Sequence, residues 1–232
     1  RVLSEKFYPA KPGESPVRII SLGDRLVSVS NFRKGNRNES TNVMVRFYNA
    51  EGSRIADQVI LEDQDYEYVA RGLVKTANEK SVVVVLQAFD RRNLQERHGV
   101  LVKLSETGQK IWQRGYRENA LENVTAIDNG YLATGEIKSD RGALAGWAMK
   151  LSHDGTVNWQ TTYVRGRQAA LLNGMPMAVN QKNEKNYFVI GRAHPADQGG
   201  IGAWLMAVAF LGRAQWQRFF RLRGYHLAAH WM

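Results

Sequence analysis

Residues 102–113 read Val102-Lys-Leu-Ser-Glu-Thr-Gly-Gln-Lys-Ile-Trp-Gln113, and residues 149–160 read Met149-Lys-Leu-Ser-His-Asp-Gly-Thr-Val-Asn-Trp-Gln160. A degenerate third copy runs from Met206 to Gln217. A fainter fourth copy, without the tryptophan, runs from Val45 to Gly52. In the first three copies a glycine stands four residues ahead of the tryptophan. A repeat of this length restricts the architecture before any single residue is interpreted.

The spacing of the copies indicates the class of repeat. Their glycines, Gly52, Gly108, Gly155 and Gly212, lie 56, 47 and 57 residues apart. Repeats of about 40 to 50 residues with four strands each are typical of β-propeller blades, whereas helical repeats need apolar residues three and four positions apart. The segments between the glycines are β-branched or alternating, as in Val82–Leu86. The sequence therefore predicts an all-β chain, a β-propeller of four-stranded antiparallel blades.

Four full units are expected near residues 24–74, 80–128, 130–180 and 186–231, after a partial blade in residues 1–23, which makes about four and a half blades. In the unit 130–180 the strands are expected at residues 131–137, 147–151, 157–163 and 175–179. No linker rich in Pro, Gly or Ser divides the chain, so residues 1–232 are predicted to be one domain. The half blade leaves three interpretations open: part of a larger propeller, a five-bladed ring, or an assembly subunit whose open edge strands pair with a partner protein.

The repeated glycines and tryptophans are predicted to be structural. A glycine in the short turn between two strands supplies the positive φ that a residue with a Cβ resists. A tryptophan in the next strand buries a large ring against a neighbouring sheet. The residues expected to dock successive blades in this way are Gly108, Trp112, Gly155, Trp159, Gly212 and Trp216.

A family resemblance rests on the same residues. The stretch Thr107-Gly108-Gln-Lys-Ile-Trp112 resembles the tryptophan-docking motif of quinoprotein-type β-propellers, although Val102 and Leu104 replace the upstream Ala and Asp of that motif. The whole unit resembles the KLxxxGxxxWQ blades of uncharacterised secreted and lipoprotein propellers, from about residue 24 onward. The resemblance implies a propeller that is exported to the periplasm, to the cell surface or out of the cell. The start at Arg1, without an initiator Met, fits either the removal of a leader or a shortened sequence, and the resemblance favours the first.

Loops rich in cations are predicted to share one face, because strands that alternate in direction bring every second connection to the same end of a sheet. The formal net charge of +10 favours an anionic partner, such as an acidic protein, a lipid headgroup or a glycan. The acidic stretch 62–67 interrupts this face and the basic residues form no single stripe, which argues against nucleic acid. The longest apolar run, 201–211, is too short to cross a membrane. The predicted partner-binding residues are Arg33, Lys34, Arg37, Arg91, Arg92, Arg97, His98, Arg141, Arg165, Arg167, Arg192 and His194.

The sequence offers no convergent catalytic set. His226 and His230 lack a third metal ligand nearby, and His153-Asp154 lies in a turn where Asp and Gly are favoured for geometry. His194 and Asp197 form the one His–carboxylate pair in a predicted rim loop. We therefore assign no catalytic residue, no metal and no cofactor, and predict a non-catalytic binding or scaffold module of the cell envelope. The alternative implied by the resemblance is a quinoprotein-type oxidoreductase that holds pyrroloquinoline quinone and a divalent cation.

Overall fold

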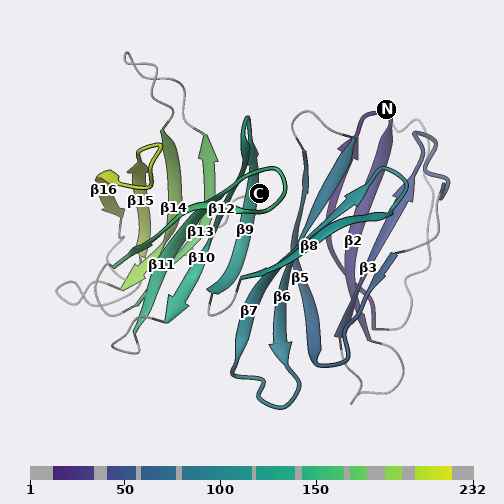
Figure 1. Cartoon of the computed structure of the whole chain (residues 1–232), viewed down its shortest axis with the longest axis horizontal. Helices are drawn as coiled ribbons and strands as arrows, with labels where there is room; N and C mark the ends of the chain where they lie inside the picture. Colours follow the sequence, from purple (N-terminus) through teal and green to yellow (C-terminus); the bar gives the residue numbers. More distant parts are fainter. Residues whose placement is uncertain are drawn as a thin grey trace. The chain divides into compact units, whose positions relative to one another are not determined.

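Strands make up the secondary structure of the part of the chain that the computed structural model describes, and no helix occurs there. The described residues are 13–33, 41–55, 59–76, 80–116, 119–138, 143–164, 168–176, 186–194 and 202–220. Contacts divide the chain into two compact units, Arg1–Arg117 (unit 1) and Glu118–Met232 (unit 2). Figure 1 labels most of the strands, numbered in chain order.

Unit 1 contains two four-stranded antiparallel sheets in which consecutive strands are neighbours. Sheet A consists of β1 (Ser15–Leu22), β2 (Arg25–Arg33), β3 (Thr41–Tyr48) and β4 (Val59–Leu61). Sheet B consists of β5 (Tyr66–Lys75), β6 (Ser81–Asp90), β7 (Arg97–Ser105) and β8 (Lys110–Tyr116).

Unit 2 repeats this plan with two further antiparallel meanders. Sheet C consists of β9 (Asn119–Ile127), β10 (Gly130–Lys138), β11 (Leu144–Leu151) and β12 (Val157–Tyr163). Sheet D consists of β13 (Gln168–Pro176), β14 (Tyr187–His194), β15 (Gly202–Val208) and β16 (Ala214–Phe220). One parallel pairing, Leu144 with Gln168, joins the two sheets.

Each unit buries one apolar core between its two sheets. In unit 1, Val82, Val84 and Leu86 of β6 join a cluster with Val27 and Val29 of β2. These residues alternate along their strands, so a single face of each sheet turns to the core. The cluster of unit 2 contains residues of sheet D, Tyr187, Val189, Trp204, Met206 and Val208, and residues of sheet C, Leu132, Ala148 and Tyr163, with Trp159 packed against it. Face-to-face packing of successive sheets is therefore common to both units.

The amide of Asn31 adds a polar link between the two sheets of unit 1. Its Oδ1 accepts a hydrogen bond from the Ala70 backbone N–H at 2.7 Å, and its Nδ2 donates to the Ala70 carbonyl at 3.4 Å. The side chain of β2 therefore pairs with the backbone of β5 as a neighbouring strand would. Because β5 also contacts β1, the first strands of sheets A and B run close together.

The prediction of an all-β chain built from four-stranded antiparallel sheets is confirmed. The assignment of strands to sheets, however, was wrong by one strand. The sequence placed the strand near residues 175–179 at the end of the unit 130–180, but β13 pairs along its length with β14 and opens sheet D. The segment 17–20 likewise lies in the opening strand of sheet A and closes no blade. A repeat reveals its period but not its phase, because a strand at a boundary fits either neighbour by sequence alone.

The third and fourth strands of each sheet are joined by turns with the same hydrogen bonds. The Gly108 N–H donates to the Ser105 carbonyl at 3.0 Å, and the Ser105 N–H donates to the Gln109 carbonyl at 2.8 Å. The corresponding pairs recur around Gly52, Gly155 and Gly212. All four glycines have positive φ, between 77° and 87°. The fourth, fainter copy of the repeat therefore forms the same turn as the other three.

Candidate functional site

The long connections of unit 1 emerge at one end of its sheets. The residues 62–65 between β4 and β5 and the residues 91–96 between β6 and β7 meet there, since the Arg91 N–H donates to the Asp65 carbonyl at 3.0 Å. β2 ends and β3 begins at the same end, because Arg33 pairs with Thr41, and Asn31, two residues before Arg33, bonds to Ala70 in the first half of β5. We call the residues 33, 62–66 and 90–98 the loop end of unit 1.

Arg91 holds the two described connections of the loop end together. Its Nε donates to the Tyr66 carbonyl at 3.3 Å, and its Nη2 donates to the Asp63 carbonyl at 3.0 Å. A guanidinium bound to two backbone carbonyls fixes the relative position of these segments. Arg91 was predicted to be a partner-binding residue, and its contacts give it a structural part as well.

Arg92 points away from the protein. Its side chain is 88% exposed, and its Nη2 lies 3.6 Å from a carboxylate oxygen of Asp65, which is itself 70% exposed. Exposed ion pairs of this kind contribute little to stability because water screens both charges. The guanidinium of Arg92 is therefore accessible to a binding partner.

Arg97 and His98 begin β7 and are both half-buried. The His98 ring meets the Tyr66 ring edge to face, with 4.7 Å between the centroids. The backbone of Gly115 on β8 lies close by, since a Cβ on that residue would approach the His98 ring at 3.7 Å. His98 is thus partly enclosed by β5 and β8.

A polar network beside His98 was not predicted from the sequence. Asp63 accepts hydrogen bonds from the backbone N–H groups of Asp65 and Tyr66 and from the hydroxyl of Tyr68, the last at 3.2 Å. The Nε2 of Gln113 donates to the same hydroxyl at 3.2 Å. Burial, and then the charge of Asp63, raise the pKa of Tyr68 to about 12. The short spacing of Asp63 and Tyr68 is the one feature of the sequence that could have predicted this network. Gln113 lies 45 residues after Tyr68, and no local pattern links the two.

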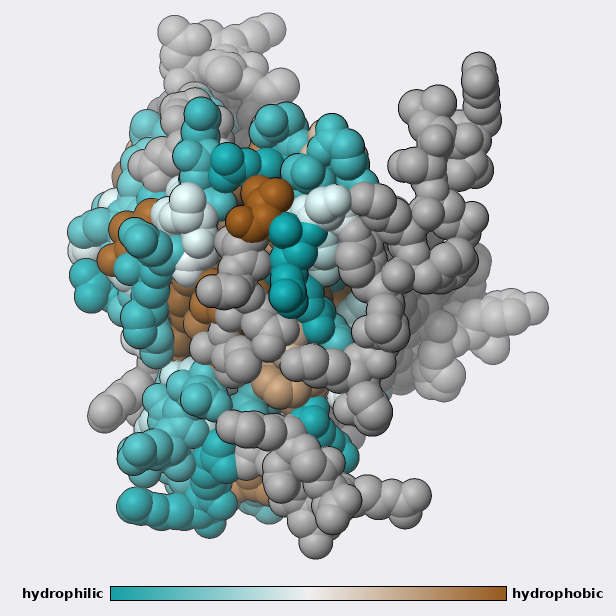
Figure 2. All heavy atoms as spheres, turned by 90° about the vertical axis from the view of Figure 1, so that its right-hand side faces the viewer, coloured by the Kyte–Doolittle hydropathy of each residue, from teal (hydrophilic) through white to brown (hydrophobic). Residues whose placement is uncertain are grey.

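Charges of both signs alternate at the loop end. The cations are Arg33, which is exposed at the end of β2, and Arg91, Arg92 and Arg97, and the anions are Glu62, Asp63, Asp65, Asp90 and Glu96. The sequence predicted that the acidic stretch 62–67 would interrupt the basic face, and the Arg92–Asp65 ion pair is one such contact. On the side of unit 1 that Figure 2 presents, hydrophilic side chains cover most of the described surface. The predicted residues Lys34 and Arg37 lie outside the described residues.

Unit 2 places two predicted residues on β14. The Arg192 guanidinium, 51% exposed, has its Nη2 3.9 Å from Oε2 of Glu136 on β10, whose side chain is 5% exposed. His194 ends the strand and is half-buried. The predicted residues Arg141, Arg165 and Arg167, together with Asp197, His226 and His230, lie outside the described residues.

The His153-Asp154 pair lies in the turn between β11 and β12. Asp154 accepts hydrogen bonds from the Ser152 hydroxyl, the Thr156 N–H and the Thr156 hydroxyl, which lower its pKa to about 2. The His153 ring meets the Tyr131 ring edge to face, with 6.2 Å between the centroids. The carboxylate of Asp154 thus holds the turn together.

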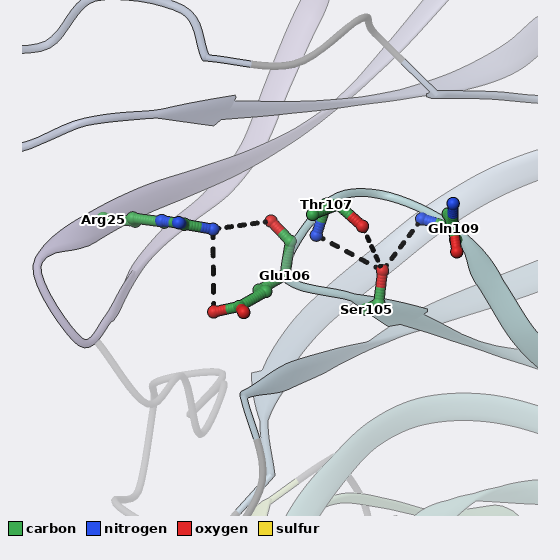
Figure 3. Close-up of polar contacts among 5 residues, drawn as sticks. All are labelled: Arg25, Ser105, Glu106, Thr107 and Gln109. Carbon is green, nitrogen blue, oxygen red and sulfur yellow. Dashed lines mark hydrogen bonds and ion pairs between the residues drawn. The ribbon is translucent and has the colours of Figure 1, made fainter.

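In unit 1 the turn between β7 and β8 rests on sheet A. A Cβ on Gly108 would lie 2.9 Å from Cγ2 of Val59 and 3.2 Å from Cε2 of Phe47, so a larger residue would force these side chains to shift. Figure 3 shows that Arg25 also reaches this turn, where its Nη1 donates to the Glu106 carbonyl at 3.2 Å and lies 3.6 Å from the Glu106 carboxylate. Within the turn, the Ser105 hydroxyl accepts the N–H groups of Thr107 and Gln109. The same turn is therefore ordered internally and anchored to the preceding sheet.

In unit 2 the turn between β15 and β16 rests on sheet C in the same way. The Trp159 indole N–H donates to the Phe210 carbonyl at 2.8 Å, and a Cβ on Gly212 would approach the Trp159 ring at 2.8 Å. The Tyr163 hydroxyl donates to the Gly212 carbonyl at 2.6 Å. The Lys150 Nζ lies 3.4 Å from the centre of the Phe210 ring, and burial lowers the pKa of Lys150. Trp159 thus binds both the backbone and the glycine of the next sheet's turn.

The other two repeated tryptophans have different surroundings. Trp112 is half-buried on β8. Trp216 is 42% exposed, and its ring meets that of Phe188 in its own sheet at 5.8 Å. The three tryptophans occupy equivalent positions in their sheets. In each sheet the tryptophan pairs with the penultimate paired residue of the third strand. Their side chains are nevertheless not equally buried.

The described residues contain no group of three or more His, Asp or Glu side chains arranged to hold a metal ion. The quinoprotein alternative requires carboxylate or carbonyl ligands for its cation, and the described residues supply no such cluster of side chains. Gly108, one residue of the motif that suggested this alternative, packs against side chains of sheet A. No helix of the described residues has the length and apolar character needed to cross a membrane.

The chain was also compared with known proteins. No family model matches it, and no curated protein gives a significant match.

Proposed function

We propose that this chain is a non-catalytic binding module of the cell envelope, in which the sheets stack as β-propeller blades and the loop end of unit 1 binds an acidic protein surface. The observation that carries the proposal is the state of Arg92. Its guanidinium is 88% exposed and has only an exposed carboxylate 3.6 Å away, so a partner's carboxylate replaces that contact at little cost.

The sheets supply a rigid support for this end. Connections between strands carry binding residues most often where a packed scaffold holds them in place. Arg91 ties the two described connections to each other through the carbonyls of Asp63 and Tyr66. Arg92, the next residue, is thereby presented on a fixed backbone, which lowers the entropy that binding costs.

The carboxylates at the same end restrict the partner. Asp65 and Glu96 repel an extended anion such as a polyphosphate chain, whereas a folded acidic protein brings separate charges of both signs. The loop end is therefore expected to bind an acidic protein more tightly than a uniformly anionic polymer. Its affinity is expected to fall as salt is added, since exposed charges are screened beyond about 10 Å at moderate ionic strength.

The test compares two double variants with equal loss of charge. Arg33→Ala/Arg92→Ala removes two exposed cations from the loop end, and Arg54→Ala/Lys75→Ala removes two exposed cations from the opposite end of unit 1. The probes are an acidic model protein, a sulfated glycan and phosphatidylserine vesicles, each titrated at low and at physiological salt.

We expect the loop-end variant to bind the acidic protein roughly threefold to tenfold more weakly, the sum of two exposed ion pairs, and the control variant to bind like the unaltered chain. Equal losses in both variants would show that net charge alone causes binding and would refute the proposal. Tighter binding of the glycan or the vesicles than of the acidic protein would also contradict it.

A further inference from the structure

Sheet D has an apolar face turned away from the core of unit 2. Residues on its strands alternate between two faces, and Tyr187, Val189, Trp204 and Met206 occupy the face in the core. The pairing register shows which residues lie on the opposite face, here called the outer face. Its residues are Phe188, Ile190 and Arg192 on β14, Ala203, Leu205 and Ala207 on β15, and Trp216, Arg218 and Phe220 on β16.

Large apolar side chains of the outer face are open to solvent. Trp216 is 42% and Phe220 51% exposed. Phe188, Ile190 and Leu205 are half-buried between them. A continuous apolar surface on a sheet is typical of a site that packs against another protein surface.

The outer face has the same pairing register as the face of sheet C that sheet D covers. On that face Trp159, Thr161 and Tyr163 of β12 receive the turn between β15 and β16. Trp216, Arg218 and Phe220 of β16 have the same register against β15 that these three residues have against β11. The C–D contact is therefore a template for what the outer face of sheet D accepts, namely a tight turn with a glycine.

The template also sets the chemistry of the missing turn. The indole N–H of Trp216 needs a carbonyl two residues before the glycine, as Trp159 has in Phe210. Ala207 stands where Lys150 lies over the Phe210 ring, so the outer face needs no aromatic ring at that position. Arg218 stands at the position equivalent to Thr161, which lies beside Gly212. An acidic residue next to the glycine of the incoming turn would therefore pair with Arg218.

The turn between β3 and β4 meets these requirements. It has the same hydrogen bonds as the turn around Gly212, and Gly52 has a φ of 77°. Ala50, a small residue, stands two positions before the glycine, and Glu51 stands immediately before it. Both residues are exposed. Glu51 supplies the carboxylate that Arg218 calls for.

From this complementarity we infer that two copies of the chain associate head to tail, with the outer face of sheet D in one copy receiving residues 49–53 of the second copy. In this contact the Trp216 indole N–H donates to the Ala50 carbonyl, and Arg218 pairs with Glu51 of the second copy. The two surfaces differ, so the contact is heterologous and produces rings or open chains of copies.

The test uses charge exchange between two full-length variants. Arg218→Glu changes the outer face, and Glu51→Arg changes the turn. Sedimentation equilibrium from micromolar to millimolar concentration measures self-association of each variant, of their equimolar mixture and of the unaltered chain. Circular dichroism checks that each variant keeps its strand content. Arg114→Glu on β8, an exposed charge reversal outside the contact, is the control.

The unaltered chain and the control are expected to associate with the same constant. Each of the two contact variants should associate at least about tenfold more weakly, because like charges then face each other, and the mixture should recover association because each face meets an opposite charge. Trp216→Ala should weaken association in every combination. A monomer at all concentrations overturns the inference, and so does an association that survives both charge reversals or that mixing fails to restore.

Discussion

Replacing Gly108 by alanine tests the seating of the β7–β8 turn on sheet A. Gly108 has a φ of 82°, where a residue with a Cβ is strained by about 1 to 2 kcal/mol. The added Cβ would also lie 2.9 Å from Cγ2 of Val59 and 3.2 Å from Cε2 of Phe47. Phe47 is fully buried, and overpacking of a buried side chain costs about 1 to 3 kcal/mol.

Gly23 provides the matched control in the same unit. Its φ is 63°, and a Cβ added there would meet nothing within 4 Å. Gly23→Ala therefore carries only the backbone strain of about 1 to 2 kcal/mol, whereas Gly108→Ala carries roughly 2 to 5 kcal/mol. Urea unfolding followed by circular dichroism gives both free energies. Adding Val59→Ala should reduce the penalty of Gly108→Ala, because it removes the nearest atom.

Two outcomes would refute this reasoning. The first is an equal loss of stability in Gly108→Ala and Gly23→Ala, which would mean that the turn does not rest on sheet A. The second is a Val59→Ala change that adds independently to Gly108→Ala, since residues in contact are expected to couple.

Three further predictions concern the polar contacts of unit 1. Because the pKa of Tyr68 is raised from 10.0 to about 12, the unfolded chain loses this proton first, so stability falls as the pH rises from 10 to 12. Tyr68→Phe should flatten this part of the unfolding free energy profile, and an unchanged slope would contradict it. Arg46→Ala leaves the buried carboxylate of Glu14 without the partner whose Nη2 donates to it at 2.9 Å, and should cost about 3 kcal/mol, partly recovered by adding Glu14→Gln. No recovery would show that the charge of Glu14 is not the cause. Asn31→Ala should destabilise the fold by about 1 to 3 kcal/mol and should speed the hydrogen exchange of the Ala70 amide, which loses its acceptor. An unchanged exchange rate would show that this amide has a different acceptor.

The fold could be predicted to the extent that local chemistry determines it. Four of the five residues of the run Val82–Leu86 are β-branched, and the run lies fully buried within β6. The turns were predictable because Gly108 and its counterparts stand where a positive φ is needed. The phase of the repeat was not predictable, because β13 has no feature that distinguishes the last strand of one sheet from the first of the next.

The candidate site was less accessible to sequence reasoning. Arg91 and Arg92 are adjacent and chemically identical, yet one binds two backbone carbonyls and the other is 88% exposed. The difference depends on where residues 62–65 pass, and nothing in the local sequence specifies that path. The same holds for Gln113, which reaches Tyr68 only because β8 and β5 belong to one sheet. Side-chain contacts between distant segments follow from the tertiary fold and not from spacing.

Within each unit, the two sheets stack with the turn glycine of the second sheet against the fourth strand of the first. The most direct measurement is the nuclear Overhauser effect between the Gly212 Hα protons and the Trp159 indole in the labelled full-length chain. Because a Cβ at Gly212 would lie 2.8 Å from that ring, one Hα should show a strong cross-peak to the indole and a large upfield ring-current shift, both lost in Trp159→Leu. Gly212 Hα shifts at ordinary glycine values, with no cross-peak to Trp159, would contradict the stacking.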